Sequence, residues 1–221
     1  MTVIVLAGTI GAGKSTLTGY LAKHLNTQPF YEPVGDNPVL PLFYKDPDKY
    51  AFLLQIYFLN QRFHTIKQAF YDDNNVLDRS IYEDSLFFHL NADMGRATQQ
   101  EVDVYDSLLD NMMEELTYEP KKSPDLLVDI SVSLPTMLER IKKRGRDYEQ
   151  LDADPTLLDY YKKLNARYVD WYNDYDASPK MQIDGDKYDF VANKDDLNTV
   201  LGLIDDKIKE VRQVQPLPEA K

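Results

Sequence analysis

The sequence predicts an α/β fold, with a parallel five-stranded sheet flanked by helices. Short, continuous apolar runs recur along the chain, and such runs are typical of strands that a parallel sheet buries on both faces. Stretches with apolar residues three or four positions apart separate these runs, and this spacing is typical of helices. Because strands alternate with helices, we expect ligands to bind beyond the carboxyl ends of the strands.

The five strands are expected where the apolar runs occur, at residues 3–7, 28–32, 76–79, 126–131 and 181–184. Helical spacing marks further stretches, at about residues 17–25 and 52–70 and at 134–144, 156–175 and 195–212. The chain shows no internal repeat, and Pro216 and Pro218 indicate a loose end. We therefore expect one domain over residues 1–213 and a flexible C-terminal tail over residues 214–221.

Composition and charge narrow the class of partner. Of the 221 residues, 43% are hydrophobic and 28% are charged, so the chain can bury a sizeable core. The formal net charge of -12 opposes binding to a nucleic acid polymer or to an anionic membrane surface. The absence of cysteine excludes disulfides and thiolate metal sites. The apolar N-terminal run is too short for a signal peptide or a membrane span, and we expect a cytoplasmic protein.

A glycine-rich loop follows the first expected strand and matches the pattern G-x-x-x-x-G-K-[ST] at every position. In this pattern backbone N–H groups surround phosphate oxygens, the lysine reaches the β- and γ-phosphates, and the serine hydroxyl binds Mg²⁺. A glycine turn without a ligand is the alternative, which the strand before the loop and the helix after it disfavour. By itself the loop predicts nucleotide binding and no particular reaction. The expected ATP contacts are Gly8, Thr9, Ile10, Gly11, Ala12, Gly13, Lys14, Ser15 and Thr16.

Acidic residues end two other expected strands. Glu32 ends the second strand, where its carboxylate could accept a proton from an attacking hydroxyl. An ordinary surface glutamate before a turn-forming proline would explain this position equally well. Asp78 ends the third strand, as expected of an acid that binds Mg²⁺ directly or through water, and Arg79 adds a cation beside it. For this pair the alternative is a salt bridge at the strand end.

A basic cluster ends the helix expected at residues 134–144. Arg140, Arg144 and Arg146 lie there together with two lysines and a glycine. Such a run is usually a solvated helix face, and cations near a helix C-terminus offset the helix dipole. In an acidic protein that binds a triphosphate, the cluster favours a lid that closes over the phosphates and excludes water.

Taken together, these residues resemble the deoxynucleoside kinase family from residue 3 to about residue 208, and in particular its lactobacillus-type deoxyadenosine and deoxyguanosine kinases. The resemblance is carried by the phosphate loop, Glu32 before a proline, the triplet Asp78-Arg79-Ser80, and the pattern R-x-x-x-R-G-R at residues 140–146. It implies a P-loop kinase fold with an arginine-rich lid, which uses ATP and Mg²⁺ to phosphorylate the 5′-hydroxyl of a deoxynucleoside in nucleotide salvage. It also implies a homodimer, or a heterodimer with a related subunit.

The resemblance further implies roles for single residues. Glu32, Arg79 and Lys14 would be catalytic, with Glu32 as the base, while Ser15 and Asp78 would hold Mg²⁺. The residues expected to bind the nucleoside are Glu32, Tyr44, Gln55, Arg62, Arg79, Asp84, Phe88 and Asp159. The residues expected to bind ATP beyond the phosphate loop are Arg140, Arg144, Arg146, Asp186, Lys187, Tyr188 and Phe190.

Within the nucleoside set, Tyr44 and Asp159 would bind the 3′-hydroxyl, and Phe88 would stack on the base. A glutamine amide such as that of Gln55 can form a bidentate pair with adenine. Relatives that carry the Arg62–Asp84 pair accept purines or deoxycytidine. The favoured acceptor is therefore deoxyadenosine, followed by deoxyguanosine.

Two alternative functions remain at this point. A thymidylate-type nucleoside monophosphate kinase would share the phosphate loop and the arginine lid, but it needs extra cations for the acceptor's phosphate, where this chain has acids. A P-loop regulatory module would bind a nucleotide and switch partners, and its lid and acceptor residues would then have no role.

Overall fold

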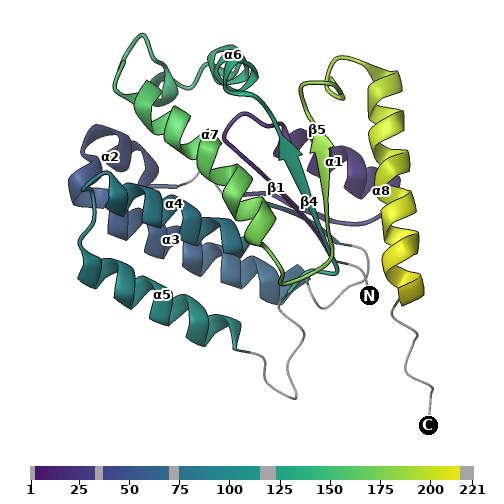
Figure 1. Cartoon of the computed structure of the whole chain (residues 1–221), viewed down its shortest axis with the longest axis horizontal. Coiled ribbons are helices and arrows are strands. Elements are labelled where there is room, and N and C mark those ends of the chain that lie inside the picture. The colour runs from purple at the N-terminus through teal and green to yellow at the C-terminus, as the bar shows by residue number, and fades with distance from the viewer. Residues whose placement is uncertain (1–2, 33–36, 70–74, 115–122, 215–221) are drawn as a thin grey trace.

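The computed structural model describes residues 3–32, 37–69, 75–114 and 123–214 (Figure 1). Within this part of the chain, five strands form one sheet in the order β2-β3-β1-β4-β5, and all neighbouring pairs are parallel. The strands are β1 Ile4–Gly8, β2 Pro29–Phe30, β3 Val76–Asp78, β4 Leu126–Ser131 and β5 Lys180–Asp184. The predicted parallel five-stranded sheet is confirmed.

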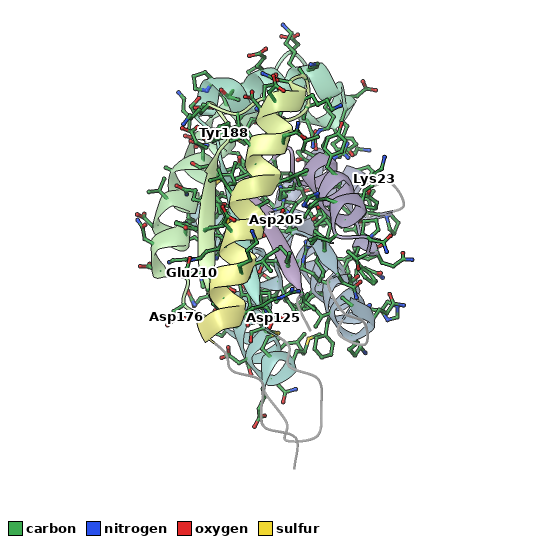
Figure 2. All side chains as sticks on the ribbon, turned by 90° about the vertical axis from the view of Figure 1, so that its right-hand side faces the viewer. Lys23, Asp125, Asp176, Tyr188, Asp205 and Glu210 are labelled. Atoms are coloured by element: carbon green, nitrogen blue, oxygen red, sulfur yellow. The ribbon has the colours of Figure 1, made fainter. Side chains whose placement is uncertain are left out.

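Helices cover both faces of the sheet. They are α1 Lys14–His24, α2 Leu40–Lys45, α3 Pro47–Ala69, α4 Ile81–Asp93, α5 Gln99–Met113, α6 Leu134–Arg144, α7 Leu157–Asp174 and α8 Lys194–Val214, with a short 3-10 helix, η1, at Asp147–Glu149. Figure 1 shows α1 and α8 on one side of the sheet and α3, α4 and α5 on the other. Figure 2 views the side of α8, where His24 of α1 contacts Asp205 of α8 at 2.8 Å.

The alternation of side chains along β1 divides the core between the two faces. Ile4 and Leu6 pack with α1 and α8, whereas Val5 and Ala7 pack with α3, α4 and α5. Every residue of β1 is buried. The strand is therefore apolar throughout, which is the reason that its sequence reads as a continuous run without polar alternation.

The carboxyl ends of the strands meet along one edge of the sheet, and this edge carries the loops with the candidate functional residues. The phosphate loop connects β1 to α1, Glu32 follows β2, and Arg79 follows β3. The second strand is shorter than expected, so that Glu32 lies in the loop beyond it. Glu32 still lies at the carboxyl edge of the sheet, because β2 pairs in parallel with β3.

Three helices, α2, α4 and α5, lie outside the helical stretches that the apolar spacing predicted. Both α4 and α5 begin with a capping box, in which the cap hydroxyl and a glutamate three residues later satisfy the first backbone N–H groups. Ser80 with Glu83 and Thr98 with Glu101 form these boxes, and the S/T-x-x-E pattern was available in the sequence. No helix among the described residues is long and apolar enough to cross a membrane. The expected C-terminal tail, 214–221, begins at the last residue of α8 and otherwise lies outside the described residues.

Candidate active site

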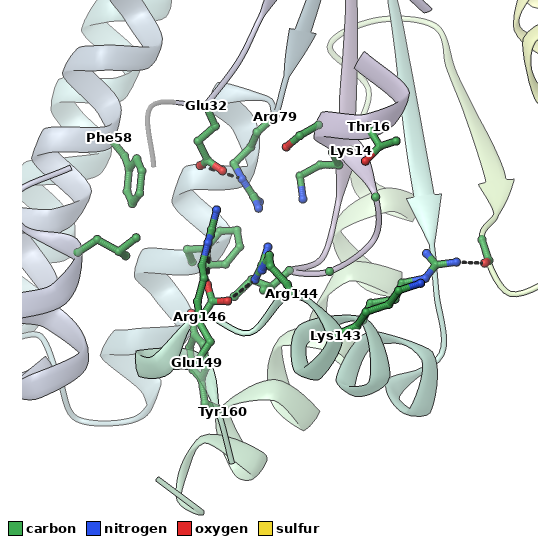
Figure 3. Close-up of a pocket in the computed structure, with 18 of the residues that line it drawn as sticks. Lys14, Thr16, Glu32, Phe58, Arg79, Lys143, Arg144, Arg146, Glu149 and Tyr160 are labelled. Carbon is green, nitrogen blue, oxygen red and sulfur yellow. Dashed lines mark hydrogen bonds and ion pairs between the residues drawn. The ribbon is translucent and has the colours of Figure 1, made fainter. Parts of the chain in front are cut away.

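A cavity of about 720 Å³ opens at the carboxyl edge of the sheet (Figure 3). The phosphate loop and α6 line one end of it, and α3 and α4 line the other. Polar and charged side chains from both ends converge on the space between, with Glu32 and Arg79 beside Lys14. The cavity can therefore hold two molecules end to end, one at the loop and one against α3 and α4.

The phosphate loop has the backbone that anion binding requires. Gly13 precedes α1 with a φ of 101°, and Gly8 has a φ of 139°, both in the region that favours glycine. A Cβ atom on Gly8 would lie 2.6 Å from the carbonyl oxygen of Ile130. The first turn of α1 carries no acidic side chain of its own, so the helix adds its N–H groups and its positive dipole end to the anion site.

Lys14 is buried and points back over the loop. Its Nζ atom donates hydrogen bonds to the carbonyl oxygens of Gly8 and Thr9, each at 2.8 Å. Burial, with a smaller contribution from Arg79, lowers the pKa of Lys14 to about 8. Ile10, Gly11, Ser15 and Thr16 line the cavity, while Thr9 and Ala12 form the buried base of the loop.

Glu32 lies between two arginines. Its Oε1 atom accepts from Nη2 of Arg62 at 2.9 Å and lies 3.1 Å from Nε of Arg79. Burial would raise the pKa of Glu32, but Arg79, Arg62 and Lys14 outweigh it and lower the pKa to about 2. The carboxylate therefore stays deprotonated at neutral pH, with its charge balanced by side chains that are themselves buried.

Asp78 and Ser15 meet beside the phosphate loop. The Ser15 hydroxyl donates a short hydrogen bond to Oδ2 of Asp78. The other carboxylate oxygen, Oδ1, is buried and has no hydrogen-bond partner among the described residues. Burial raises the pKa of Asp78, and the nearby charge of Lys14 acts in the opposite direction. An unpartnered carboxylate oxygen next to a hydroxyl is a suitable place for a hard cation that also binds phosphate oxygens.

The far end of the cavity is polar. Nε of Arg62 lies 2.5 Å from Oδ2 of Asp84, and both side chains are almost fully buried. Burial alone would lower the pKa of Arg62, but Asp84 and Glu32 raise it above the ordinary arginine value, so the guanidinium is charged. Gln55 lines the same end, and its Oε1 is buried without a partner among the described residues. This end can therefore hydrogen-bond the edge of a planar heterocycle.

Two expected nucleoside contacts do not reach the cavity. Asp159 lies on the outer side of α7, where its side chain is 61% exposed and pairs with Lys163 at 2.8 Å. Phe88 is fully buried and packs against Phe52 and Tyr105 in the core. Helix geometry explains the second difference, because the cavity face of α4 is three residues on from Asp84 and belongs to Phe87.

The structure places other side chains where Asp159 and Phe88 were expected. Phe58 and Phe87 line the cavity, so aromatic faces are available to a base. Glu149, at the end of η1, lines it beside Tyr44 and is 3% exposed. The Tyr44 ring lies 4.9 Å from the ring of Tyr148. Glu149 follows the lid arginine Arg146 by three residues, and this spacing was a sequence signal that could have indicated it.

The lid arginines hold different partners. Arg140 donates to the carbonyl oxygens of Ala12 at 2.9 Å and Gly185 at 2.7 Å, and thus joins the phosphate loop to the loop after β5. Arg144 and Arg146 both contact the carboxylate of Glu149, Arg146 at 3.3 Å (Figure 3). All three arginines line the cavity. The cluster is therefore part of the site rather than a solvated helix face.

The loop after β5 contributes unevenly to the cavity. Asp186 lines it and accepts from the backbone N–H of Ser133, the residue that caps α6, at 3.0 Å. Lys187 extends over the ring of Tyr188 at 4.8 Å, and Phe190 is buried with its ring against Gly13. Asp189 and Val191, which the sequence analysis did not name, line the cavity in this region.

Comparison with known families supports the arrangement of the site. A model of the family described as deoxynucleoside kinase matches residues 4–209. The chain belongs to the deoxynucleoside kinase family. The resemblance drawn from the phosphate loop, the Asp78-Arg79-Ser80 triplet and the lid is thereby confirmed, and the protein is an ATP-dependent kinase with a P-loop kinase fold. The two alternative functions are not favoured.

Alignments with known kinases cover nearly the whole chain. A deoxyguanosine kinase of Lactobacillus acidophilus is 68% identical over 96% of this chain and 92% of its own length. A deoxyadenosine kinase of the same organism is 56% identical over 95% of this chain and 97% of its own. Among solved structures, deoxyadenosine kinase from M. mycoides with bound dATP aligns with a TM-score of 0.76 and 34% identity over 95% of this chain and 100% of that one.

The lowered pKa of Lys14 predicts a pH dependence of ATP binding. The triphosphate would favour the charged ammonium group, so that binding above pH about 8 requires the uptake of a proton. The dissociation constant of ATP should rise by up to about tenfold per pH unit above that value. Calorimetry in buffers of different ionisation enthalpy would measure both effects. A dissociation constant that stays flat up to pH about 9, without proton uptake, would contradict this role of Lys14.

Proposed function

We propose that this kinase transfers the γ-phosphate of ATP to the 5′-hydroxyl of a purine deoxynucleoside and thereby forms the 5′-monophosphate in nucleotide salvage. The carrying observation is that the phosphate loop and Glu32 open onto one cavity, whose far end presents Gln55, Arg62 and Asp84. The acceptor is thus bound with its base at α3 and α4 and its primary alcohol near Lys14. We assign these roles to one domain that spans residues 1–213.

The base preference rests on the far end of the cavity and on the relatives. The Arg62–Asp84 pair combines donor and acceptor groups, which the edge of either purine can match, and Gln55 suits adenine. The relatives named deoxyguanosine kinase are 68% and 67% identical to this chain, and the one named deoxyadenosine kinase is 56% identical. These observations support deoxyguanosine as the better acceptor and deoxyadenosine as the second, the reverse of the order that Gln55 alone favours.

An assay of phosphate transfer from ATP to each of the four deoxynucleosides and their monophosphates tests the function directly. Deoxyguanosine and deoxyadenosine should exceed thymidine in kcat/KM by at least about 100-fold, because thymine would leave buried polar groups unpaired. Phosphorylation of thymidylate in preference to nucleosides would contradict the proposal. Tight nucleotide binding without acceptor-dependent ADP formation would also contradict it.

Phosphoryl transfer here depends mainly on positioning and charge. Lys14 and the N-terminal end of α1 would neutralise the β- and γ-phosphate oxygens, and Arg79 would hold Glu32 against the 5′-oxygen. With a pKa of about 2, Glu32 is a weak base. It would therefore orient the hydroxyl and receive its proton late, when the new bond to phosphorus has made that proton acidic.

The donor set beside the phosphate loop fits Mg²⁺. We propose that Ser15 and Asp78 hold it, since Asp78 retains a buried oxygen without a partner among the described residues. Mg²⁺ at protein sites commonly takes one or two protein oxygens together with phosphate oxygens and water. When bound, it would supply positive charge that offsets the charge developing on the phosphates.

The lid would close the donor end. We propose that Arg144 and Arg146 exchange Glu149 for phosphate oxygens when ATP is bound, while Arg140 stays with the backbone of the phosphate loop. Asp186 and the neighbouring loop would then border the adenine. Water would be excluded from the reacting groups, which strengthens the charge interactions around them.

The family resemblance supports a proposal for the assembly and location of the kinase. We propose that the chain acts in the cytoplasm as a homodimer or as a heterodimer with a related subunit. The exposed apolar side chains of Val104 and Leu108 on α5 and of Val169 on α7 are compatible with a protein contact.

Replacement of Glu32 by Gln should lower kcat by about 10²- to 10⁴-fold, because the amide cannot accept the proton of the 5′-hydroxyl. KM for the deoxynucleoside should change by a few-fold at most, since Arg62 and Arg79 can still contact the amide oxygen. Glu139→Gln is a matched control, as Glu139 is an exposed acid that lines the donor end of the same cavity. Turnover of Glu32→Gln at the rate of this control would remove Glu32 from the mechanism.

We propose that Glu149 takes the place assigned to Asp159 and binds the 3′-hydroxyl with Tyr44. Glu149→Gln should raise KM for the deoxynucleoside by about tenfold or more, because a buried hydrogen bond to a charged group is lost. Asp159→Asn should leave both kinetic constants within about twofold, since an exposed ion pair contributes little. Steady-state kinetics of the two variants decide between the residues, and an effect confined to Asp159→Asn would restore the original assignment.

A further inference from the structure

Glu83 lies at the root of the active site and is fully buried, although it does not line the cavity. Among the described residues, four donors reach its carboxylate. Oε1 accepts from the backbone N–H of Gly8 at 3.1 Å, from Nη1 of Arg79 at 3.2 Å and from the hydroxyl of Tyr168 at 2.7 Å. Oε2 accepts from the backbone N–H of Ser80 at 2.6 Å.

The bond to Ser80 is the ordinary part of this arrangement, since it completes the capping box of α4. A second capping box, Thr98 with Glu101 at the start of α5, shows what such a glutamate does elsewhere in the chain. Glu101 accepts from the backbone N–H and the hydroxyl of Thr98 at 2.8 Å and lies at the surface. The contacts of Glu83 with β1, α7 and Arg79 therefore exceed what the capping of a helix requires.

Arg79 needs such support because its backbone is unusual. It has a φ of 77°, which is uncommon for a residue other than glycine and costs conformational energy. This backbone turns the side chain from the end of β3 into the cavity. The guanidinium then lies between two carboxylates, with Nε 3.1 Å from Glu32 and Nη1 3.2 Å from Glu83, and it covers the ring of Phe87 at 4.7 Å.

Tyr168 closes the same cluster from α7. Its hydroxyl donates to Glu83 and accepts from Nη1 of Arg79 at 2.9 Å. The side chain is 5% exposed, so these bonds form in a medium that strengthens them. Two helices, α4 through Glu83 and α7 through Tyr168, thus hold one edge of the Arg79 guanidinium, while its other edge contacts Glu32.

From these contacts we infer that Glu83, together with Tyr168, is a positioning residue for phosphoryl transfer: it sets the Arg79 guanidinium against Glu32 and joins it to the first residue of the phosphate loop. Gly8 begins that loop, and its N–H points at Glu83. The Glu83 carboxylate therefore connects the phosphate loop with Arg79, and through Arg79 with Glu32. The inference deepens the proposed function and rests on it.

The Glu83→Gln variant tests the role, because the amide keeps the size of the side chain but replaces one acceptor oxygen by a donor. Both oxygens of Glu83 accept hydrogen bonds, so the new NH₂ group would face another donor in either orientation. Where it faces the donors at Oε1, it repels Nη1 of Arg79 and displaces the guanidinium. We expect kcat to fall by about 10- to 100-fold, as for a displacement of about 1 Å in an active site, with KM for the deoxynucleoside within about threefold.

The matched control is Glu101→Gln, which removes the equivalent glutamate from the capping box of α5. It should lose a similar helix-capping contribution and keep the wild-type kcat. Both variants are assayed well below their melting temperatures, so that a difference in stability does not enter kcat. Equal values of kcat for Glu83→Gln and Glu101→Gln would overturn the inference.

Tyr168→Phe gives a second test that leaves the carboxylate in place, should Glu83→Gln fail to fold. We expect kcat to fall by about 3- to 10-fold, since one of the bonds that orient Arg79 is lost. Tyr175→Phe is its control, because this tyrosine also lies at α7 and bonds Ser178 away from the site. A Tyr168→Phe variant with the kcat of Tyr175→Phe would overturn the inference.

A double-mutant comparison shows whether Glu83 acts through Arg79. In an Arg79→Lys background, Glu83→Gln should change kcat by less than about threefold, because the group that it positions is already altered. Fully additive losses would overturn positioning through Arg79. Absence of phosphate transfer in the unaltered enzyme would instead contradict the proposed function itself, so that the two failures are distinguishable.

Discussion

The buried guanidinium of Arg79 is the charge around which the active site is organised. A cation in such a place is tolerated when carboxylates surround it, and here Glu32 and Glu83 lie on its two sides. The same cation holds Glu32 deprotonated at the edge of the cavity. The contacts that pair the buried charge therefore also hold the Glu32 carboxylate beside Lys14, where the proposed transfer would need it.

The parallel sheet brings the residues that make these contacts together. Because β1, β2 and β3 run in one direction, the residues that follow them emerge at one edge, although they are dozens of positions apart in the sequence. The loop after β1 supplies an anion site, and the residues after β2 and β3 supply the opposing charges. The acidic net charge of the protein is thus compatible with phosphate binding, since Lys14, Arg79 and the lid arginines all line the cavity at this edge.

A second buried carboxylate pairs with the arginines of the lid. Arg144 and Arg146 contact Glu149, which also borders the acceptor end beside Tyr44. The donor and acceptor regions therefore share the buried carboxylate of Glu149. If Arg144 and Arg146 left Glu149, the charge around it would change in both regions. In the proposed mechanism, Glu149 would therefore connect the binding of the two substrates with closure of the lid.

The sequence by itself determined the parallel sheet, the phosphate loop and the positions of Glu32, Asp78 and Arg79, because buried strands and glycine loops leave local patterns that depend on near neighbours. It could not decide which face of a helix meets the cavity. Phe88 was assigned to the cavity in place of its neighbour Phe87, because one position on a helix turns a side chain by about 100°. Asp159 lies on the exposed side of α7, and Glu149 of η1 lines the cavity instead. Glu149 and the additional partners of Glu83 depend on contacts between distant segments, which arise when α4, α7 and the phosphate loop pack together.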